Sequence, residues 1–421
     1  MTARTRGQWI LLALLVISVT INYIDRGNLS IAASRLSSEL QLDPEKIGLL
    51  LSSFFWTYAA MQIVAGWLID RYSVYWIFAG GFFIWSAATA LTGLAGGFAT
   101  LLALRLVLGF GESVSYPAYS KIIAQGFTEQ HRGLANGLID LGSKSGPALG
   151  LMIGGVIISH YGWRPLFVSV GLISMLWLVP WIWVGRRASR KSEHTVQHSG
   201  LEAGPGMMEI AGQRSAWGTF LCLFCGNYVW YFLLTWLPWY LVRERHYSEA
   251  AMGRFGSMAF WAVGLASLIS GVISDRLVHA GGSPTFVRKT FAAGGLMGAI
   301  VMVFVPLLES QSASLAVLII ACISFGCYSS HPWLISQTLA GPAAAGRWSG
   351  MQNAVGNLAG VIAPWLTGRI VRDTGHFVYA FAVVGVILGL GAASYLLVIG
   401  RIEPIIWRPK IFFRPQVKAD L

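Results

Sequence analysis

Charged side chains are scarce in this sequence of 421 residues: they make up 11% of it, whereas hydrophobic residues reach 55%. A water-soluble globular protein could not build its polar surface from this composition. Apolar runs of roughly 20 residues recur along the chain, and each is long enough to cross the ~30 Å hydrocarbon layer of a bilayer as a helix. We therefore expect an all-α membrane protein with twelve transmembrane helices. The expected spans cover residues 8–29, 46–69, 75–95, 99–125, 133–159, 163–185, 215–241, 250–275, 287–307, 313–339, 347–371 and 376–400.

Cysteine is also rare: Cys222 and Cys225 form a C-x-x-C pair, and Cys322 and Cys327 are the other two. All four fall in expected helices, where a reduced thiol packs as a small hydrophobic group, so we expect no metal site. Enzyme motifs are missing too. We find no histidine pair spaced for haem, no acid-rich metal cluster, no glycine-rich phosphate loop and no G-x-S-x-G elbow. The sequence therefore predicts neither a cofactor nor an enzymatic activity.

The net charge of +12 would suggest a nucleic-acid partner in a soluble protein, but here the basic residues are divided among alternate connections between spans. They fall mainly on one side of the membrane if the N-terminus is cytoplasmic, in line with the positive-inside rule. A cleaved signal peptide is not expected, because Asp25 and Arg26 occupy the place of a small-residue cleavage site. We expect a monomer in the inner membrane of a bacterium, with both termini cytoplasmic and no nucleic-acid partner.

A short box of the form G-x-x-x-D-R occurs twice, after the second span ("GWLIDR") and after the eighth ("GVISDR"). A polar, basic segment lies between the two halves, so the chain reads as one six-span unit used twice. The expected parts are residues 1–185, the cytoplasmic linker 186–214, residues 215–400 and the tail 401–421. The box residues are Gly66, Asp70, Arg71, Gly271, Asp275 and Arg276.

The repeated box resembles that of the major facilitator superfamily, in which it lies in the loops after helices two and eight. The resemblance implies a gating role for the box and a fold of two pseudo-symmetric six-helix bundles. It also implies a substrate site near the middle of the membrane, alternately exposed to the two sides. The fold does not identify the substrate.

Five ionisable residues lie within expected spans of the first half: Asp25, Arg26, Arg105, Glu112 and Lys144. Ionisable groups in such places are costly and are normally paired or face a polar cavity. Arg105 and Glu112 are two helical turns apart on one face, ~10 Å from each other. Asp25 and Arg26 have a second interpretation, as a local pair that neutralises itself at the end of the first helix.

Glycines and a possible helical pair leave two further questions open. Gly109 and Gly111 lie between Arg105 and Glu112 and indicate either room for a cavity or close helix packing. Asp140 and Lys144 have the i, i+4 spacing of an ion pair, which favours a structural role for Lys144.

A permanent guanidinium in a low-dielectric site is a natural receptor for a carboxylate. Desolvation disfavours the charged form of a carboxylic acid, so a buried acid can carry a proton near physiological pH. We expect an organic anion as substrate and H+ as the coupling ion. One proton per monoanion would cancel the cost of moving one charge against the membrane potential, about 2.3 kcal/mol per 100 mV, and two would make uptake electrogenic.

Three longer strings, "NYIDRGNLSIA", "RLVLGFGESVSYPA" and "GNYVWYFLLTWLPWYLV", together resemble the anion:cation symporter family of organic-anion and sugar-acid carriers. The resemblance covers nearly the whole chain. It implies that Asp25 and Glu112 carry protons, and that Arg105 modulates the proton affinity of Glu112. The residues implied to bind substrate are Tyr23, Arg26, Tyr58, Arg105 and Asn353.

Lys144 departs from the pattern of galactonate-type members of that family. As a second positive anchor, it makes a dicarboxylate or an aromatic acid plausible beside a monocarboxylate sugar acid. His331, in the tenth span, has a structural role and a proton relay as alternatives, and we expect the structural one.

A competing interpretation comes from the fifth span, where Gly142, Gly146, Pro147 and Gly150 resemble a box of proton-coupled drug exporters. Transport would then run outward. Against it, the basic residues of the expected site outnumber its acids, which suits an anion better than a cationic drug. A sensor that transports nothing is a further alternative.

Overall fold

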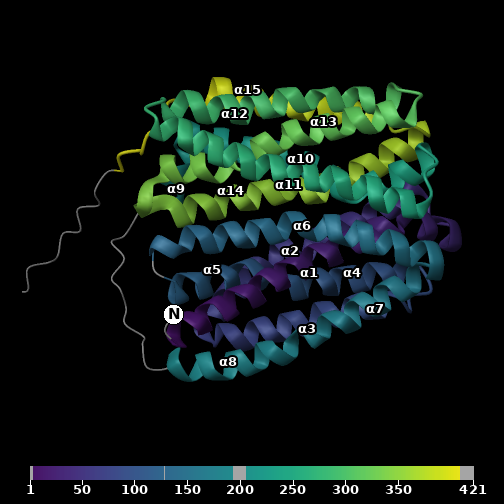
Figure 1. Cartoon of the computed structure of the whole chain (residues 1–421), viewed down its shortest axis with the longest axis horizontal. Helices are drawn as coiled ribbons and strands as arrows, with labels where there is room; N and C mark the ends of the chain where they lie inside the picture. Colours follow the sequence, from purple (N-terminus) through teal and green to yellow (C-terminus); the bar gives the residue numbers. More distant parts are fainter. Residues whose placement is uncertain (1–2, 128, 193–204, 408–421) are drawn as a thin grey trace, which may run out of the picture.

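The computed structural model describes residues 3–127, 129–192 and 205–407, which form long helices running side by side (Figure 1). The helices of the first half of the chain make one bundle and those of the second half make another. The N-terminal bundle consists of α1 (Ala3–Leu40), α2 (Pro44–Arg71), α3 (Val74–Thr92), α4 (Phe98–Glu112), α5 (Ser115–Gly126), α6 (Glu129–Tyr161), α7 (Trp163–Leu176) and α8 (Leu178–Ser192).

The C-terminal bundle follows the short helix α9 (Met207–Ala211) and has a similar layout. It consists of α10 (Arg214–Trp239), η1 (Tyr240–Glu244), α11 (Glu249–His279), α12 (Pro284–Ala299), η2 (Ile300–Leu307), α13 (Gln311–Ser329), α14 (His331–Thr374), α15 (Val378–Ala393) and η3 (Ser394–Val398).

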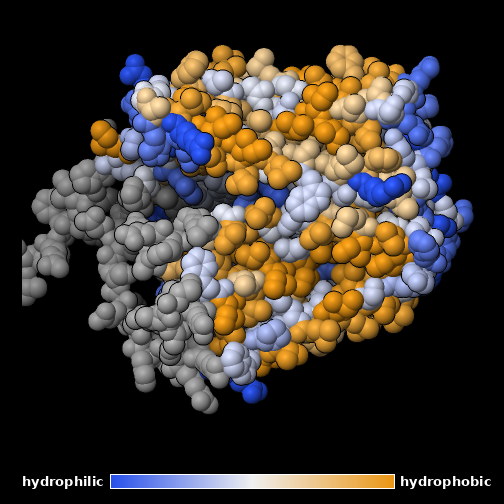
Figure 2. All heavy atoms as spheres, in the orientation of Figure 1, coloured by the Kyte–Doolittle hydropathy of each residue, from blue (hydrophilic) through white to orange (hydrophobic). Residues whose placement is uncertain are grey.

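The predicted membrane fold is confirmed. Among the described residues, eleven helical segments are long and apolar enough to cross a bilayer. Helix α2, 28 residues long, packs between α4 and α14 and supplies the twelfth crossing. Apolar side chains cover the flank of the molecule between its ends (Figure 2), as expected of an integral membrane protein.

Helix starts follow from local sequence. The side chain of Asp43 caps α2 by accepting a hydrogen bond from the backbone N–H of Lys46, with Pro44 at the first helical position. Ser248 caps α11 in the same way through the N–H of Ala251. These caps lie in short connections, so they fix the helix ends outside the apolar layer.

Several predicted boundaries were wrong. The first helix does not end near residue 29 but continues to Leu40, so the segment 22–28 lies in its middle. Helix α8 runs into the expected linker as far as Ser192, and α9 packs against α10 and α14. The rest of the linker, residues 193–204, lies outside the described residues, as does the tail from residue 408.

The tenth and eleventh spans join without a loop. Helix α14 continues through a kink at Gly341, whose φ of 63° favours a residue without a side chain. The start of the tail covers this kink: the Trp407 indole donates to the carbonyl of Ala340, and the Ile405 N–H donates to that of Leu339.

The two bundles are joined at one end. We call the end where α1 begins proximal, and the end where α1 finishes at Leu40 distal. Among the described residues, every hydrogen bond between the bundles lies on the distal side of the middle of the helices. Arg35 pairs with Glu249 and Arg372 with Glu45. Further links are Arg243 to Ser34 and Ser38, Ser30 to the Thr235 carbonyl and Ser52 to the Val361 carbonyl.

Candidate transport site

The charged residues predicted in the first half meet in the interior of the N-terminal bundle. Arg26, in the middle of α1, donates from Nε to Oε2 of Glu112 at the end of α4, over 2.8 Å. The side chains are 3% and 0% exposed, so this ion pair is fully withdrawn from water. Removing one partner of such a pair leaves an uncompensated charge and typically costs about 3–5 kcal/mol.

Aromatic rings surround the guanidinium of Arg26. Its central carbon lies 4.8 Å from the ring centre of Tyr23, 4.9 Å from that of Phe54 and 4.5 Å from that of Tyr58. Ring faces attract a cation at these distances, which stabilises the buried charge without neutralising it. The Nη2 atom of Arg26 has no hydrogen-bond partner in the structure. The guanidinium therefore retains an unused donor beside its ion pair.

Arg105 binds the backbone of a neighbouring helix. Its Nε donates to the Leu50 carbonyl of α2 over 3.2 Å, and its guanidinium lies 5.2 Å from the ring of Phe54. Arg26 and Arg105 thus both pack on Phe54. Arg105 forms no ion pair with Glu112 among the described residues, and its proposed influence on that acid would act at longer range.

The glycines between Arg105 and Glu112 serve close packing, which decides that question against a cavity on this face. A Cβ atom at Gly109 would lie 2.3 Å from the Phe54 carbonyl oxygen of α2. One at Gly111 would lie 2.8 Å from the Trp85 nitrogen of α3. Both neighbouring helices therefore contact α4 through their backbones.

Asp25 does not pair with its neighbour Arg26, so the interpretation as a local neutralising pair was wrong. Adjacent residues point about 100° apart on a helix. Asp25 is 1% exposed and accepts a hydrogen bond from Asn28 Nδ2 over 3.3 Å, while Thr89 of α3 lies beside its carboxyl group. Arg26 and Asp25 therefore belong to different sides of α1.

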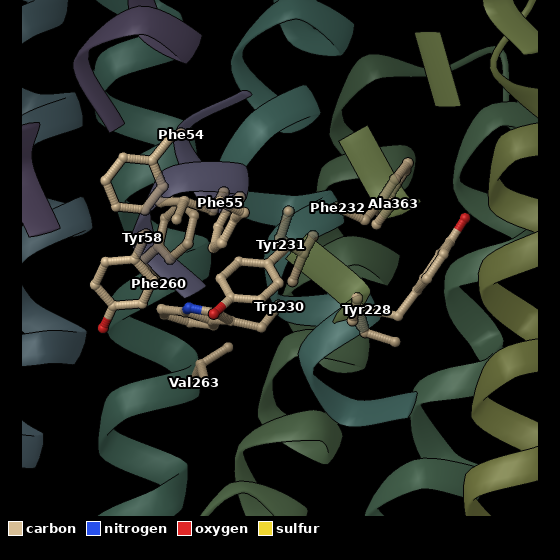
Figure 3. Close-up of a cluster of buried hydrophobic side chains, with 14 of the residues drawn as sticks. Phe54, Phe55, Tyr58, Tyr228, Trp230, Tyr231, Phe232, Phe260, Val263 and Ala363 are labelled. Atoms are coloured by element: carbon tan, nitrogen blue, oxygen red, sulfur yellow. The ribbon is translucent and has the colours of Figure 1, made fainter. Parts of the chain in front are cut away.

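The C-terminal bundle contributes an aromatic and amide surface. Tyr231 of α10 packs against Phe55 of α2 with ring centres 4.5 Å apart, and its hydroxyl donates to Asn357 Oδ1 over 3.1 Å. Figure 3 shows Phe54, Phe55 and Tyr58 gathered opposite Trp230 and Tyr231. These rings form the contact between the two bundles next to Arg26.

Lys144 also reaches across to the C-terminal bundle. Its ammonium lies 4.4 Å from the ring centre of Trp230, and a Cβ at Gly264 of α11 would be 3.5 Å from its own Cβ. Asp140 is exposed, and no ion pair joins it to Lys144 among the described residues. The i, i+4 pair that the spacing favoured is not formed.

The asparagine at this site differs from the predicted one. Asn353 is half-buried and takes part in none of the hydrogen bonds described, whereas Asn357, one turn later, binds Tyr231. Tyr231 itself and Tyr116, whose hydroxyl is 3.1 Å from that of Tyr23, were also missed. The string "QNAVGN" held both asparagines, and their helical spacing could not show which one faces the first bundle.

Comparison with known proteins decides the family. The sequence model described as Major Facilitator Superfamily matches residues 15–364. The chain belongs to this superfamily. The curated relatives below place it with the anion:cation symporter type, and it is a membrane transporter rather than an enzyme.

The relatives match almost end to end. A probable galactarate/D-glucarate transporter of Escherichia coli (strain K12) is 29% identical over 96% of this chain and 96% of its own length. The hexuronate transporter of Bacillus subtilis is 30% identical over 94% of each chain. A probable sulfoacetate transporter of Cupriavidus necator is 28% identical over 94% of this chain and 95% of its own length.

Solved structures show the same fold. A bacterial homologue of the human lysosomal transporter Spinster, described as inward-facing and unoccupied, superposes with a TM-score of 0.79 at 20% identity. The match covers 93% of this transporter and 97% of the other chain. At this identity the likeness concerns the fold alone.

The repeated boxes of this transporter lie in the last turns of helices, not in loops as the resemblance implied. Arg71 ends α2 and is exposed, with its guanidinium 5.6 Å from the Trp67 ring, and Gly66 precedes it in the helix. The side chain of Asp70 lies outside the described residues. Gly271, Asp275 and Arg276 belong to the proximal part of α11, where Asp275 and Arg276 are exposed.

The remaining candidates lie inside the C-terminal bundle. His331 is 0% exposed and stacks on Phe291 with ring centres 5.4 Å apart, while its Nδ1 is 3.1 Å from the Ser330 hydroxyl. Cys222 donates weakly to the Gly391 carbonyl, and all four cysteines are free thiols. The two measured surface grooves also lie on this bundle, away from Arg26 and Glu112.

Proposed function

We propose that this transporter imports an organic carboxylate together with protons by alternating access. The observation that carries the proposal is the buried ion pair of Arg26 and Glu112, with an unused guanidinium donor and three aromatic rings around it. A guanidinium in such a site can exchange one carboxylate for another with little change in its surroundings.

Coupling follows from competition for Arg26. When Glu112 is ionised it occupies the guanidinium, and a substrate carboxylate would bring an excess negative charge into the bundle. When Glu112 takes up a proton, Arg26 loses its counter-ion and a buried positive charge is left uncompensated. A substrate carboxylate supplies the missing charge. Proton and anion therefore bind more favourably together than either does alone, which is positive linkage between the two ligands.

We assign substrate contacts to groups that face the contact between the bundles. Arg26 binds the carboxylate, and the hydroxyls of Tyr23 and Tyr58 together with Asn357 or Asn353 bind the polar body of the acid. Lys144, which has no acidic partner among the described residues, binds a second anionic or polar end. Named relatives that carry galactarate, glucarate and sulfoacetate, each with two acidic ends, support this assignment.

We further propose that the proximal end is cytoplasmic, because the basic connections lie there, and that the membrane is the bacterial inner membrane. The distal bonds between the bundles then close the outer side, and the structure corresponds to the state that exchanges ligands with the cytoplasm. The boxes Gly66–Arg71 and Gly271–Arg276 lie at the opposite end, where the bundles must join when the transporter turns outward.

The experiment is uptake into proteoliposomes with an inward proton gradient. The probes are labelled D-glucarate, galactarate, sulfoacetate and a hexuronate, after a thermal-shift screen of the same acids, because a bound ligand stabilises the fold by mass action. We expect accumulation of at least one acid that collapses when a protonophore is added. Gradient-driven loss of preloaded acid would support the exporter instead, and no flux of any acid would contradict the proposal.

The exporter alternative has no separate support from the geometry. A Cβ atom at Gly146 would lie 2.6 Å from the Cβ of Tyr23, and one at Gly142 would lie 2.5 Å from Val19. The glycine box of α6 is therefore accounted for by its close contact with α1, which either direction of transport requires.

A further inference from the structure

The interior of the N-terminal bundle contains a group of buried polar side chains whose hydrogen-bonding capacity is not used within the protein. Both amide atoms of Asn22, one oxygen each of Asp25 and Glu112, and the polar atoms of three α3 side chains have no partner. We call these six residues the polar seam: Asn22, Asp25, Trp85, Ser86, Thr89 and Glu112. All are at most 3% exposed.

Helix geometry brings the seam together. Asn22 and Asp25 are three residues apart on α1, and Ser86 and Thr89 are three apart on α3, so each pair shares a face. The close approach at Gly111 brings the backbone of α3 at Trp85 against α4, one residue before Glu112. Thr89 lies beside the carboxyl of Asp25, and Asn22 lies beside that of Glu112. Asn22 therefore stands between the two acids.

Buried polar groups without a partner are costly, so native proteins satisfy nearly all of them with protein groups, water or ions. The seam combines donors, the Trp85 indole N–H and the Asn22 amide, with hydroxyl, amide and carboxyl acceptors. A metal cation needs acceptors alone, and it would be repelled by the guanidinium groups of Arg26 and Arg105. Water both donates and accepts, and it suits this mixture.

Asp25 needs such a connection if it carries a proton. It faces α3, away from the side of α1 on which Arg26 holds Glu112. A substrate on Arg26 therefore cannot contact the Asp25 carboxyl directly, and the protein groups on the short way from Asp25 to Glu112 are those of the seam.

We propose that the polar seam binds ordered water and conducts protons between Asp25 and Glu112, with Asn22 and Thr89 as the positioning residues; this rests on the proposed proton coupling. The proton leaves the Asp25 carboxyl for a water held by Thr89 and Ser86. It passes to a water held by the Asn22 amide and ends on the free oxygen of Glu112. Each water accepts one proton and releases one, so no other bond changes. The Asn22 amide only orients its water.

Charged and titratable neighbours set the background for this transfer. Arg105 of α4 faces both acids, and Arg26 of α1 faces Glu112. Tyr58 of α2 and Tyr119 of α5 are the phenols that interact with Glu112. None of these groups belongs to the seam, so substitutions at Asn22 and Thr89 leave them in place.

The first test needs no substrate. The purified transporter in lipid is transferred from H2O to D2O at pD 5, and infrared spectroscopy follows the isotope shift of the protonated carboxyl bands, assigned with Asp25→Asn and Glu112→Gln. We expect Asn22→Leu and Thr89→Val to slow exchange at Asp25 at least tenfold. Asn22→Ser, which leaves room for water, should restore it. Thr367→Val is the matched control, because Thr367 is a fully buried threonine of the other bundle whose hydroxyl also lacks a partner.

Unchanged exchange in folded Asn22→Leu protein, as judged by its melting temperature, would overturn the proposal. So would a missing band for protonated Asp25 at pD 5. A melting temperature that rises with NaCl but not with choline chloride, and only when Asp25 is intact, would show a sodium site instead. If Asn22→Leu does not fold, Asn22→Ser and Thr89→Val still test the proposal, because exchange should be near normal in the first and slow in the second.

The second test measures coupling. Proton-driven accumulation of D-glucarate should fall at least tenfold in Asn22→Leu, while D-glucarate counterflow without a proton gradient stays within threefold. Absence of proton-driven uptake in the unmodified transporter would count against the proposed function, and the exchange experiment would still decide whether the seam conducts protons.

Discussion

The two bundles share a layout and a repeated box, yet their interiors differ in chemistry. The N-terminal bundle buries two acids and two arginines, Asp25, Glu112, Arg26 and Arg105, together with most of the polar atoms that lack partners. Among the described residues of the C-terminal bundle, the buried polar groups are neutral hydroxyls and amides, thiols and His331. No carboxylate is buried there.

This difference shows how one scaffold used twice can divide its work. Charge that changes during transport is confined to the half in which α1 and α4 exchange contacts, and the other half supplies a neutral surface of Trp230, Tyr231 and Asn357. A neutral surface can approach or leave the charged half without carrying a large electrostatic cost of its own. The predictions below test this division of roles.

The largest effect is expected for Glu112→Gln. The amide can still accept a hydrogen bond from Arg26 but cannot exchange a proton, so proton-driven accumulation should fall more than 100-fold while substrate counterflow remains detectable. Uptake and counterflow in proteoliposomes provide both values. Normal accumulation would remove Glu112 from the mechanism and with it the electrostatic contrast between the bundles.

Arg26→Lys should weaken substrate binding about tenfold, corresponding to ~1.4 kcal/mol, because a compact ammonium cannot reproduce the fork that grips a carboxylate. Isothermal titration with the best acid from the thermal-shift screen measures the dissociation constant. Arg243→Lys, at the distal contact, is the control for a change of the same kind. Equal affinity in the Arg26 variant would make this residue structural.

In the neutral half, Asn357→Ala should weaken binding about three- to tenfold, because it removes the acceptor of the Tyr231 hydroxyl. Asn353→Ala should leave the dissociation constant within twofold. The reverse order of effects would mean that the predicted asparagine, rather than the one bound to Tyr231, meets the substrate during transport.

The smallest effect on transport is expected for His331→Phe. Phenylalanine retains the stack on Phe291 but cannot titrate, so the pH dependence of uptake should keep its midpoint and the rate should stay within twofold. Thermal unfolding should show a small loss of stability from the missing contact with Ser330. A displaced pH midpoint would assign proton transfer to both bundles.

Much of the fold was predictable, because apolar runs of membrane length must become helices and the repeated boxes indicate duplication. The helix breaks were not, since the kink at Gly341 and the extension of α1 depend on contacts between distant segments. Among site residues, Arg26 and Glu112 could be singled out by the cost of burying charge. Their pairing with each other could not, because the orientation of α1 against α4 depends on how the bundle packs.

The neutral members of the site were hardest to find. Tyr231 and Asn357 are ordinary in a chain rich in aromatic residues, and only the packing of α10 against α2 and α14 distinguishes them. Asn22 carries no charge to attract notice, and its unused amide becomes visible once the surrounding helices are in place.

The distal closure uses ion pairs open to solvent: Arg35 is 55% exposed in its pair with Glu249, and Arg372 is 38% exposed in its pair with Glu45. Dissolved salt screens such pairs over a Debye length of about 8 Å at 0.15 M and about 30 Å at 0.01 M. The medium outside the cell therefore acts on the balance between the two orientations of the transporter. A bacterium moved from fresh to brackish water would find its carrier facing the nutrient more often, without any change in the protein itself.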